Sequence, residues 1–143
     1  MDLTAQFLAY AHDFERSYAD RDWRRLGPYF AADAVYECST PAELAFRVEG
    51  RDAILARFEM ATDAFDRRFD SRALQLDPPH ASGQRVSVTG LVVYTLAGAA
   101  PFRLPFAEVA DYRGDEIVRL EDSATAEDVR RLLDWMAQHG NPT

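Results

Sequence analysis

A two-residue alternation over residues 102–112 constrains the fold of this chain more than any other feature. Successive side chains of a strand point to opposite faces of a sheet, so this segment predicts a strand with one apolar face. That face holds Phe102, Leu104, Phe106, Glu108, Ala110 and Tyr112. Glu108 is the exception in the row, and a carboxyl buried without a partner shifts its pKa toward the neutral form. We interpret Glu108 as an acid–base group; the alternatives are a Glu that turns to solvent at the rim of the sheet or pairs with an Arg.

The rest of the chain divides into helices followed by strands. Apolar residues recur at three- and four-residue spacing from Phe7 to Tyr18 and from Ile54 to Phe65, which predicts two amphipathic helices. The remaining expected elements are a short helix from Trp23 towards Phe30, brief strands at residues 34–37 and 46–48, long strands at 70–76, 84–96, 102–112 and 117–124, and a final helix from Thr125 to near Gly140. This order predicts one α+β domain over residues 1–143, in which a cone-shaped, curved antiparallel sheet wraps around the N-terminal helices and encloses a pocket.

Composition excludes several classes of partner. The formal net charge is -8, which argues against binding to nucleic acid or to an anionic membrane surface. No apolar run approaches the ~20 residues that a membrane-spanning helix needs. The first residues lack a signal-peptide core, and the single cysteine, Cys38, agrees with a reducing compartment, so we expect a cytoplasmic protein.

No motif in the sequence indicates a cofactor. The three histidines are scattered, and nothing has the spacing of a metal site. A glycine-rich phosphate loop and a dinucleotide fingerprint are both lacking. We therefore expect neither a metal nor a cofactor.

A second carboxylate is predicted beside Glu108. If residues 114–116 form the hairpin loop, Arg113 opposes Ile117 and Glu108 falls directly opposite Asp122. Cross-strand neighbours on one face lie roughly 5 Å apart at Cβ, so both groups would resist ionising together. A one-residue bulge would instead turn Asp122 outward and put Glu121 in its place, and Asp122 could also be a solvated residue near the final helix.

Other side chains are predicted to line the pocket around this pair. Gly90 on the neighbouring strand either opposes Glu108 and leaves room for a ligand or marks a bulge. The hydroxyls of Tyr10, Tyr18, Tyr36 and Tyr94 point into the pocket, or their rings belong to the core. We expect the ligand to contact Phe14, Tyr18, Cys38, Phe58, Val88, Gly90, Phe106 and Leu120.

Three segments resemble the nuclear transport factor two-like fold, and within it the SnoaL-like group. They are residues 29–37, 48–54 and 112–118, and the resemblance covers nearly the whole chain in order and spacing. It implies the cone-shaped fold. The fold hosts isomerases, dehydratases, cyclases, epoxide hydrolases and non-catalytic association domains, so function has to be argued from the site.

The resemblance can be carried over residue by residue. Ketosteroid isomerases have an aspartate base where this chain has Cys38, an oxyanion-binding Tyr where it has Phe14, and an acidic residue on the penultimate strand that corresponds to Glu108. Cys38 and Phe14 differ from the aspartate and tyrosine of the isomerases, which argues against steroid isomerisation by the proton relay of those enzymes. SnoaL-like cyclases are similar in using one pocket carboxylate for an intramolecular aldol step, although Glu adds a methylene to their Asp.

Two functions remain open at this point. The first is a cofactor-independent isomerase, cyclase or dehydratase in which Glu108, assisted by Asp122 or a tyrosine, moves a proton on an apolar carbonyl-containing ligand. The second is a non-catalytic binding or association domain. Proteins of this family often dimerise through the outer sheet face, which here includes Val109, Ile117 and Val93, so we expect a homodimer.

Overall fold

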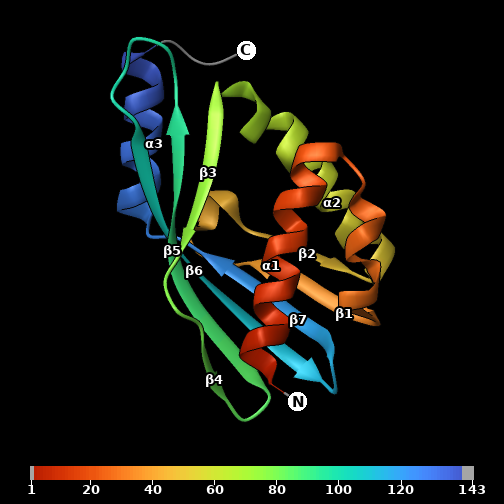
Figure 1. The fold of residues 1–143 in the computed structure, drawn as a ribbon. Helices are drawn as coiled ribbons and strands as arrows, with labels where there is room; N and C mark the ends of the chain where they lie inside the picture. The colour runs from red at the N-terminus through yellow and green to blue at the C-terminus, as the bar shows by residue number, and fades with distance from the viewer. Residues whose placement is uncertain (1, 140–143) are drawn as a thin grey trace.

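A computed structural model describes residues 2–139 of the chain as a curved sheet with helices packed on it (Figure 1). The elements are α1 (Leu3–Asp20), η1 (Trp23–Tyr29), β1 (Phe30–Cys38), η2 (Ala42–Leu44), β2 (Phe46–Glu49), α2 (Arg51–Ala64), η3 (Asp66–Arg68), β3 (Ser71–Leu76), β4 (His80–Ser82), β5 (Arg85–Thr95), β6 (Phe102–Arg113), β7 (Glu116–Ser123) and α3 (Ala126–Gln138). The predicted end of the last helix, Gly140, lies outside the described residues. Among residues 2–139, no helix is long and apolar enough to cross a membrane.

Helices α1 and α3 begin at side-chain caps that the sequence encodes. Asp2 accepts hydrogen bonds from the backbone N–H groups of Thr4 and Ala5 at the start of α1, at 3.0 and 3.2 Å. Thr125 accepts one from the N–H of Asp128 at the start of α3, at 3.0 Å. Such caps satisfy N–H groups that have no partner inside the helix. The predicted start of the final helix at Thr125 is confirmed.

The sheet has seven strands in the order β2-β1-β7-β6-β5-β3, with β4 paired to β5. The predicted α+β architecture with a curved sheet is confirmed. One pair differs from the antiparallel expectation, because β1 runs parallel to β7. A parallel pair needs a long crossover, and here all the elements between β1 and β7 supply it. Local sequence patterns do not encode a pairing between strands so far apart.

Two apolar clusters hold the helices on the sheet. The larger one joins α1, α2 and the strands and includes Phe7, Leu26, Phe30 and Ile54, all at most 1% exposed. The smaller one lies where α3 packs, at the end of β5 and β6 away from β4 (Figure 1), and is centred on Trp135. Burying each large apolar side chain contributes about 1.5–3 kcal/mol.

A bulge between β6 and β7 decides which face several residues occupy. Asp111 pairs with Arg119, but the next residue, Tyr112, pairs with Ile117, so β7 carries one extra residue. The hairpin loop is therefore shorter than predicted, and Arg113 pairs with Glu116. Ile117 is 0% exposed in the larger cluster. Its predicted place on the outer sheet face is wrong, because the bulge turns it inward.

Candidate functional site

A cavity of about 240 Å³ lies between α1, α2 and the inner face of the sheet. Its walls are mostly apolar and include Phe7, Phe14, Phe58, Leu74, Val92 and Phe106. The few polar groups on the wall include Glu108, Asp122, Tyr36 and Arg72. An apolar hollow with a few polar groups is the usual form of a small-molecule site.

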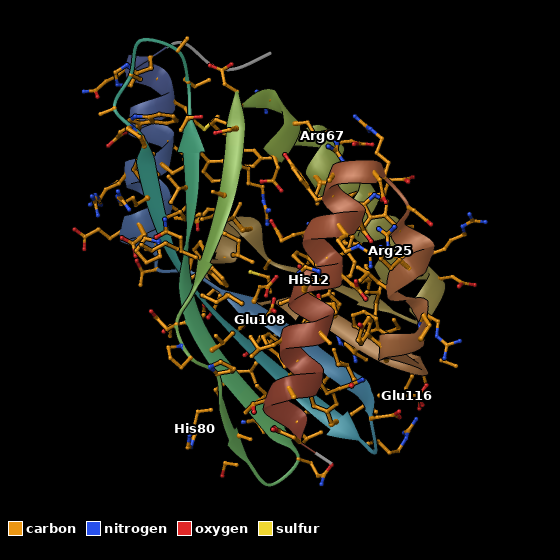
Figure 2. The ribbon with its side chains drawn as sticks, in the orientation of Figure 1. His12, Arg25, Arg67, His80, Glu108 and Glu116 are labelled. Atoms are coloured by element: carbon orange, nitrogen blue, oxygen red, sulfur yellow. The ribbon has the colours of Figure 1, made fainter. Side chains whose placement is uncertain are left out.

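Glu108 and Asp122 lie side by side on the cavity wall. They are directly paired across β6 and β7, which confirms the predicted register. Both are partly buried and both line the cavity. Figure 2 shows Glu108 in the interior, between α1 and the sheet, whereas Glu116 lies at the rim. The bulge comes after this pair along β6, so it does not turn Asp122 outward.

The environment of Glu108 favours its neutral form. Burial, followed by the proximity of Asp122, raises the pKa of Glu108 well above its ordinary value. The hydroxyl of Tyr36 donates to Asp122 Oδ2 at 2.5 Å, while Asp122 Oδ1 is buried without a hydrogen-bond partner. A proton on Glu108 supplies a donor for Asp122. Glu108 therefore keeps its proton to a higher pH than an ordinary glutamate does.

Two tyrosines extend this arrangement. Tyr10 on α1 and Tyr36 on β1 are 3% and 9% exposed, and both line the cavity. Burial raises the pKa of both phenols, and the nearby carboxyls Glu108 and Asp122 raise it further, so both hydroxyls remain protonated donors. Tyr94 instead donates to Asp66 Oδ1 at 2.7 Å in the smaller cluster, and Tyr18 lies under Arg67, with 4.4 Å from guanidinium to ring centre.

Cys38 lies beside Asp122, because the two residues pair across the parallel strands β1 and β7. Its thiol donates to the carbonyl oxygen of Thr40 at 3.4 Å. Burial and the neighbouring Asp122 raise the pKa of the thiol. A thiol of raised pKa is a poor nucleophile, so Cys38 contributes shape rather than reactivity to the cavity.

The structure divides the other predicted ligand contacts into two groups. Phe14, Cys38, Phe58 and Phe106 line the cavity, whereas Tyr18, Val88, Gly90 and Leu120 do not. Val88 and Leu120 are at most 4% exposed and pack inside the larger cluster. Both side chains belong to the buried core and do not line the cavity.

Gly90 does not lie opposite Glu108, as one of the two predicted alternatives had it. It pairs with Phe106, while Val88 is the residue opposite Glu108. A Cβ at Gly90 would lie 2.5 Å from the carbonyl oxygen of Gln75 on β3. The missing side chain thus lets β3 approach β5 closely and does not leave room for a ligand.

Arg72 is a site residue that the sequence analysis missed. It lies on β3 with Leu74 and Leu76, and these three alternate residues all line the cavity. The same parity argument that singled out Glu108 could have found it, since a charged residue here shares a face with two leucines. Its guanidinium is bound to Glu15, with 2.7 Å from Nη1 to Oε1.

The arrangement suits proton transfer. Within residues 2–139, no group of His, Cys, Asp and Glu side chains is placed to hold a metal ion. The polar groups at the Glu108 end of the cavity include a carboxyl pair and the two neutral tyrosine hydroxyls. They can give a proton, take one, and donate hydrogen bonds to a developing negative charge.

Comparison with solved structures shows that other proteins share this fold. The chain is similar to a hypothetical protein with a ketosteroid isomerase-like fold from Catenulispora acidiphila, with 23% identity, a TM-score of 0.65 and 93% of each chain covered. It is also similar to a protein of unknown function from Burkholderia pseudomallei, described as NTF2-like, with 20% identity, a TM-score of 0.68 and coverage of 92% of this chain and 98% of that one.

A third solved structure, a putative polyketide cyclase from Sinorhizobium meliloti, has 20% identity and a TM-score of 0.59 over 80% of this chain and 93% of that one. At these identities the likeness concerns the fold alone. A search of curated proteins finds no match. Residues 11–120, which are most of the chain, match the family model of the SnoaL-like domain. The chain therefore belongs to the SnoaL-like domain family.

Proposed function

We propose that this protein is a cofactor-independent acid–base enzyme that moves a proton on an apolar, carbonyl-containing small molecule. The observation that carries this proposal is the Glu108–Asp122 pair on the wall of an aromatic cavity, with Tyr36 bound to Asp122. A carboxyl whose pKa is raised toward neutrality can exchange a proton with a substrate under ordinary conditions. Isomerisation, cyclisation and dehydration all begin with such an exchange next to a carbonyl.

Glu108 is the member of the pair that exchanges the proton with the ligand. Asp122 is less accessible to a ligand, because its Oδ2 accepts from Tyr36 and its Oδ1 is buried without a hydrogen-bond partner. The ligand's C–H bond breaks, its proton goes to one oxygen of Glu108, and the proton already on the other oxygen of Glu108 shifts to Asp122. The electron pair moves to the carbonyl oxygen, where the neutral hydroxyl of Tyr10 is the candidate donor. Returning the proton to another carbon forms an isomer.

A proton-exchange assay tests this function without knowledge of the natural substrate. Indanone and tetralone, two apolar cyclic ketones, are incubated with the protein in deuterated water, and loss of the protons next to the carbonyl is followed by NMR. The wild-type protein should accelerate the exchange. Glu108→Gln should slow it by about a hundredfold or more while binding of the ketones is nearly unchanged, because the amide cannot take the proton.

Glu121→Gln is the matched control for this experiment. Glu121 neighbours Asp122 in sequence but faces outward, where Arg119 Nη2 lies 2.7 Å from its Oε2. The control should retain the exchange rate of the wild type. Exchange retained in Glu108→Gln would overturn the proton-transfer role, and ketone binding without acceleration in the wild type would favour the alternative, a non-catalytic ligand-binding domain.

We also propose that the protein is a cytoplasmic homodimer that associates through the outer sheet face. The single free cysteine supports the compartment. Leu91, Pro105 and Ala107 support the interface, since these partly exposed apolar residues line a groove on that face. Sedimentation equilibrium is the test, and a strict monomer at high concentration would rule the dimer out.

A further inference from the structure

Arg72 gives the cavity a second polar end. Its side chain is only 8% exposed, and its charge is paired with Glu15, as a buried arginine requires. It precedes Leu74 and Leu76 on the inner face of β3, so an apolar stretch separates it from the carboxyl pair. The same cavity is thus lined by a guanidinium at one end and by Glu108 with Asp122 at the other.

The register of the sheet gives the separation of the two ends. Arg72 pairs with Tyr94 on β5, whereas Glu108 pairs with Val88 on the same strand. Six residues along a strand span at most about 20 Å between backbones, and both side chains are long and extend into the cavity. A ligand that reached both would be elongated, with an apolar middle that matches Leu74, Val92 and Phe106.

The surroundings of Arg72 hold its guanidinium in place. Nη1 lies 2.7 Å from Glu15 Oε1, and Nε lies 3.7 Å from Asp66 Oδ2. The rings of Phe14 and Tyr18 flank it, with their centres 5.7 and 4.9 Å from the guanidinium carbon. Neither ion-pair contact uses Nη2, so its two N–H groups are the candidate donors for a ligand.

The charge of this end is already balanced. Glu15 alone offsets the guanidinium, and Asp66 lies on its other side, where burial raises the pKa of that carboxyl. An anionic ligand group would therefore meet acidic neighbours with little net positive charge to attract it. A neutral oxygen, such as a carbonyl or a hydroxyl, can accept a hydrogen bond from the guanidinium without that repulsion.

We infer that Arg72 is a specificity-determining residue that binds a neutral oxygen at the far end of an elongated, largely apolar substrate whose reacting end lies at Glu108. This inference rests on the proposed function for the reacting end. It narrows the substrate class to molecules with two separated oxygen groups, of which the remote one carries no charge.

Binding of para-substituted phenols tests this inference. Three probes share a phenol for the carboxyl end and an alkyl tail of equal length that ends in a methyl, a hydroxyl or a carboxylate, with tails from butyl to octyl. Isothermal titration calorimetry should show that, at the best tail length, the hydroxyl probe binds about threefold to tenfold tighter than the methyl probe. The carboxylate probe should bind no better than the methyl probe.

Two variants separate the role of Arg72 from general damage to the protein. Glu15→Gln with Arg72→Met removes the ion pair as a unit, which avoids leaving one buried charge alone, and should abolish the advantage of the hydroxyl probe. Glu15→Gln by itself leaves the guanidinium less balanced, so the carboxylate probe should gain affinity. Circular dichroism checks that both variants are folded.

Equal binding of the hydroxyl and methyl probes to the wild type at every tail length would overturn the inference. So would an advantage that survives in the folded double variant. Either result leaves the proton exchange at Glu108 untouched, which the ketone assay measures separately. If none of the phenols binds, the pocket itself fails as a ligand site, and the inference falls with the proposed function.

Discussion

At the scale of single residues, the Tyr36 hydroxyl is the contact on which the carboxyl pair most depends. It donates to Asp122 Oδ2 at 2.5 Å inside the protein. Tyr36→Phe leaves that oxygen without its donor, so we expect a loss of about 1–3 kcal/mol in the free energy of unfolding, measured by urea denaturation.

Tyr112→Phe, on β6 of the same sheet, provides a matched control. The Tyr112 hydroxyl is buried but has no hydrogen-bond partner in the structure. Removing it should leave the free energy of unfolding unchanged or raise it, because no hydrogen bond is lost and a desolvated polar group disappears. Equal losses in the two variants would contradict the bond from Tyr36 to Asp122.

The sequence predicted the faces of single residues correctly where no bulge interrupts the alternation of side chains along a strand. The alternation over β6 identified Glu108, and the counting of hairpin residues placed Asp122 opposite it. The same counting misplaced Ile117, because a bulge cannot be read from alternation. Arg72 was overlooked because β3 is short and its exposed residues alternate with only three inward ones.

At the scale of elements, the packing of β3 on β5 depends on Gly90. A Cβ there would lie 2.5 Å from the Gln75 carbonyl oxygen and 3.1 Å from a ring carbon of Phe106. The backbone of β3 would have to move, so Gly90→Ala should lower the free energy of unfolding by about 1–3 kcal/mol, as overpacking does. Urea denaturation followed by circular dichroism measures the loss.

Gly27→Ala is the control for that substitution. A Cβ at Gly27 would have its nearest neighbour, Arg51 Cδ, at 3.9 Å, which is an ordinary contact. Alanine also restricts the unfolded chain, so this variant should be neutral or slightly more stable. If Gly90→Ala were as stable as Gly27→Ala, the close approach of β3 would be contradicted.

The order of elements was predictable, but their long-range pairing was not. Helical periodicity and strand alternation gave the helices and strands with roughly correct bounds. The parallel pairing of β1 with β7 brings together residues such as Cys38 and Asp122, which are far apart in the chain. That juxtaposition depends on how the whole sheet closes, and no local pattern encodes it.

At the scale of the whole molecule, the buried carboxyl links stability to pH. The pKa of Glu108 is raised above its ordinary value of 4.5, so the folded protein binds more protons than the unfolded chain above that pH. The stability that this group contributes is complete below pH 4.5 and is lost as pH rises through the folded pKa.

Glu108→Gln removes this linkage. The variant should have little advantage in melting temperature near pH 4.5 and an advantage that grows as the pH is raised toward 8, measured by thermal denaturation in matched buffers. If the difference in melting temperature between variant and wild type stayed constant over this pH range, Glu108 would have the same pKa in the folded and unfolded states.

The central claim is that Glu108, buried beside Asp122, carries a proton at neutral pH. Infrared difference spectroscopy of the wild type against Glu108→Gln at pH about 7 tests it most directly, because a protonated carboxyl has a C=O stretching band separate from that of carboxylates. We expect a carboxylic-acid band in the wild type that disappears in the variant. A spectrum of the wild type with carboxylates only would contradict the proton on Glu108 and the acid–base role built on it.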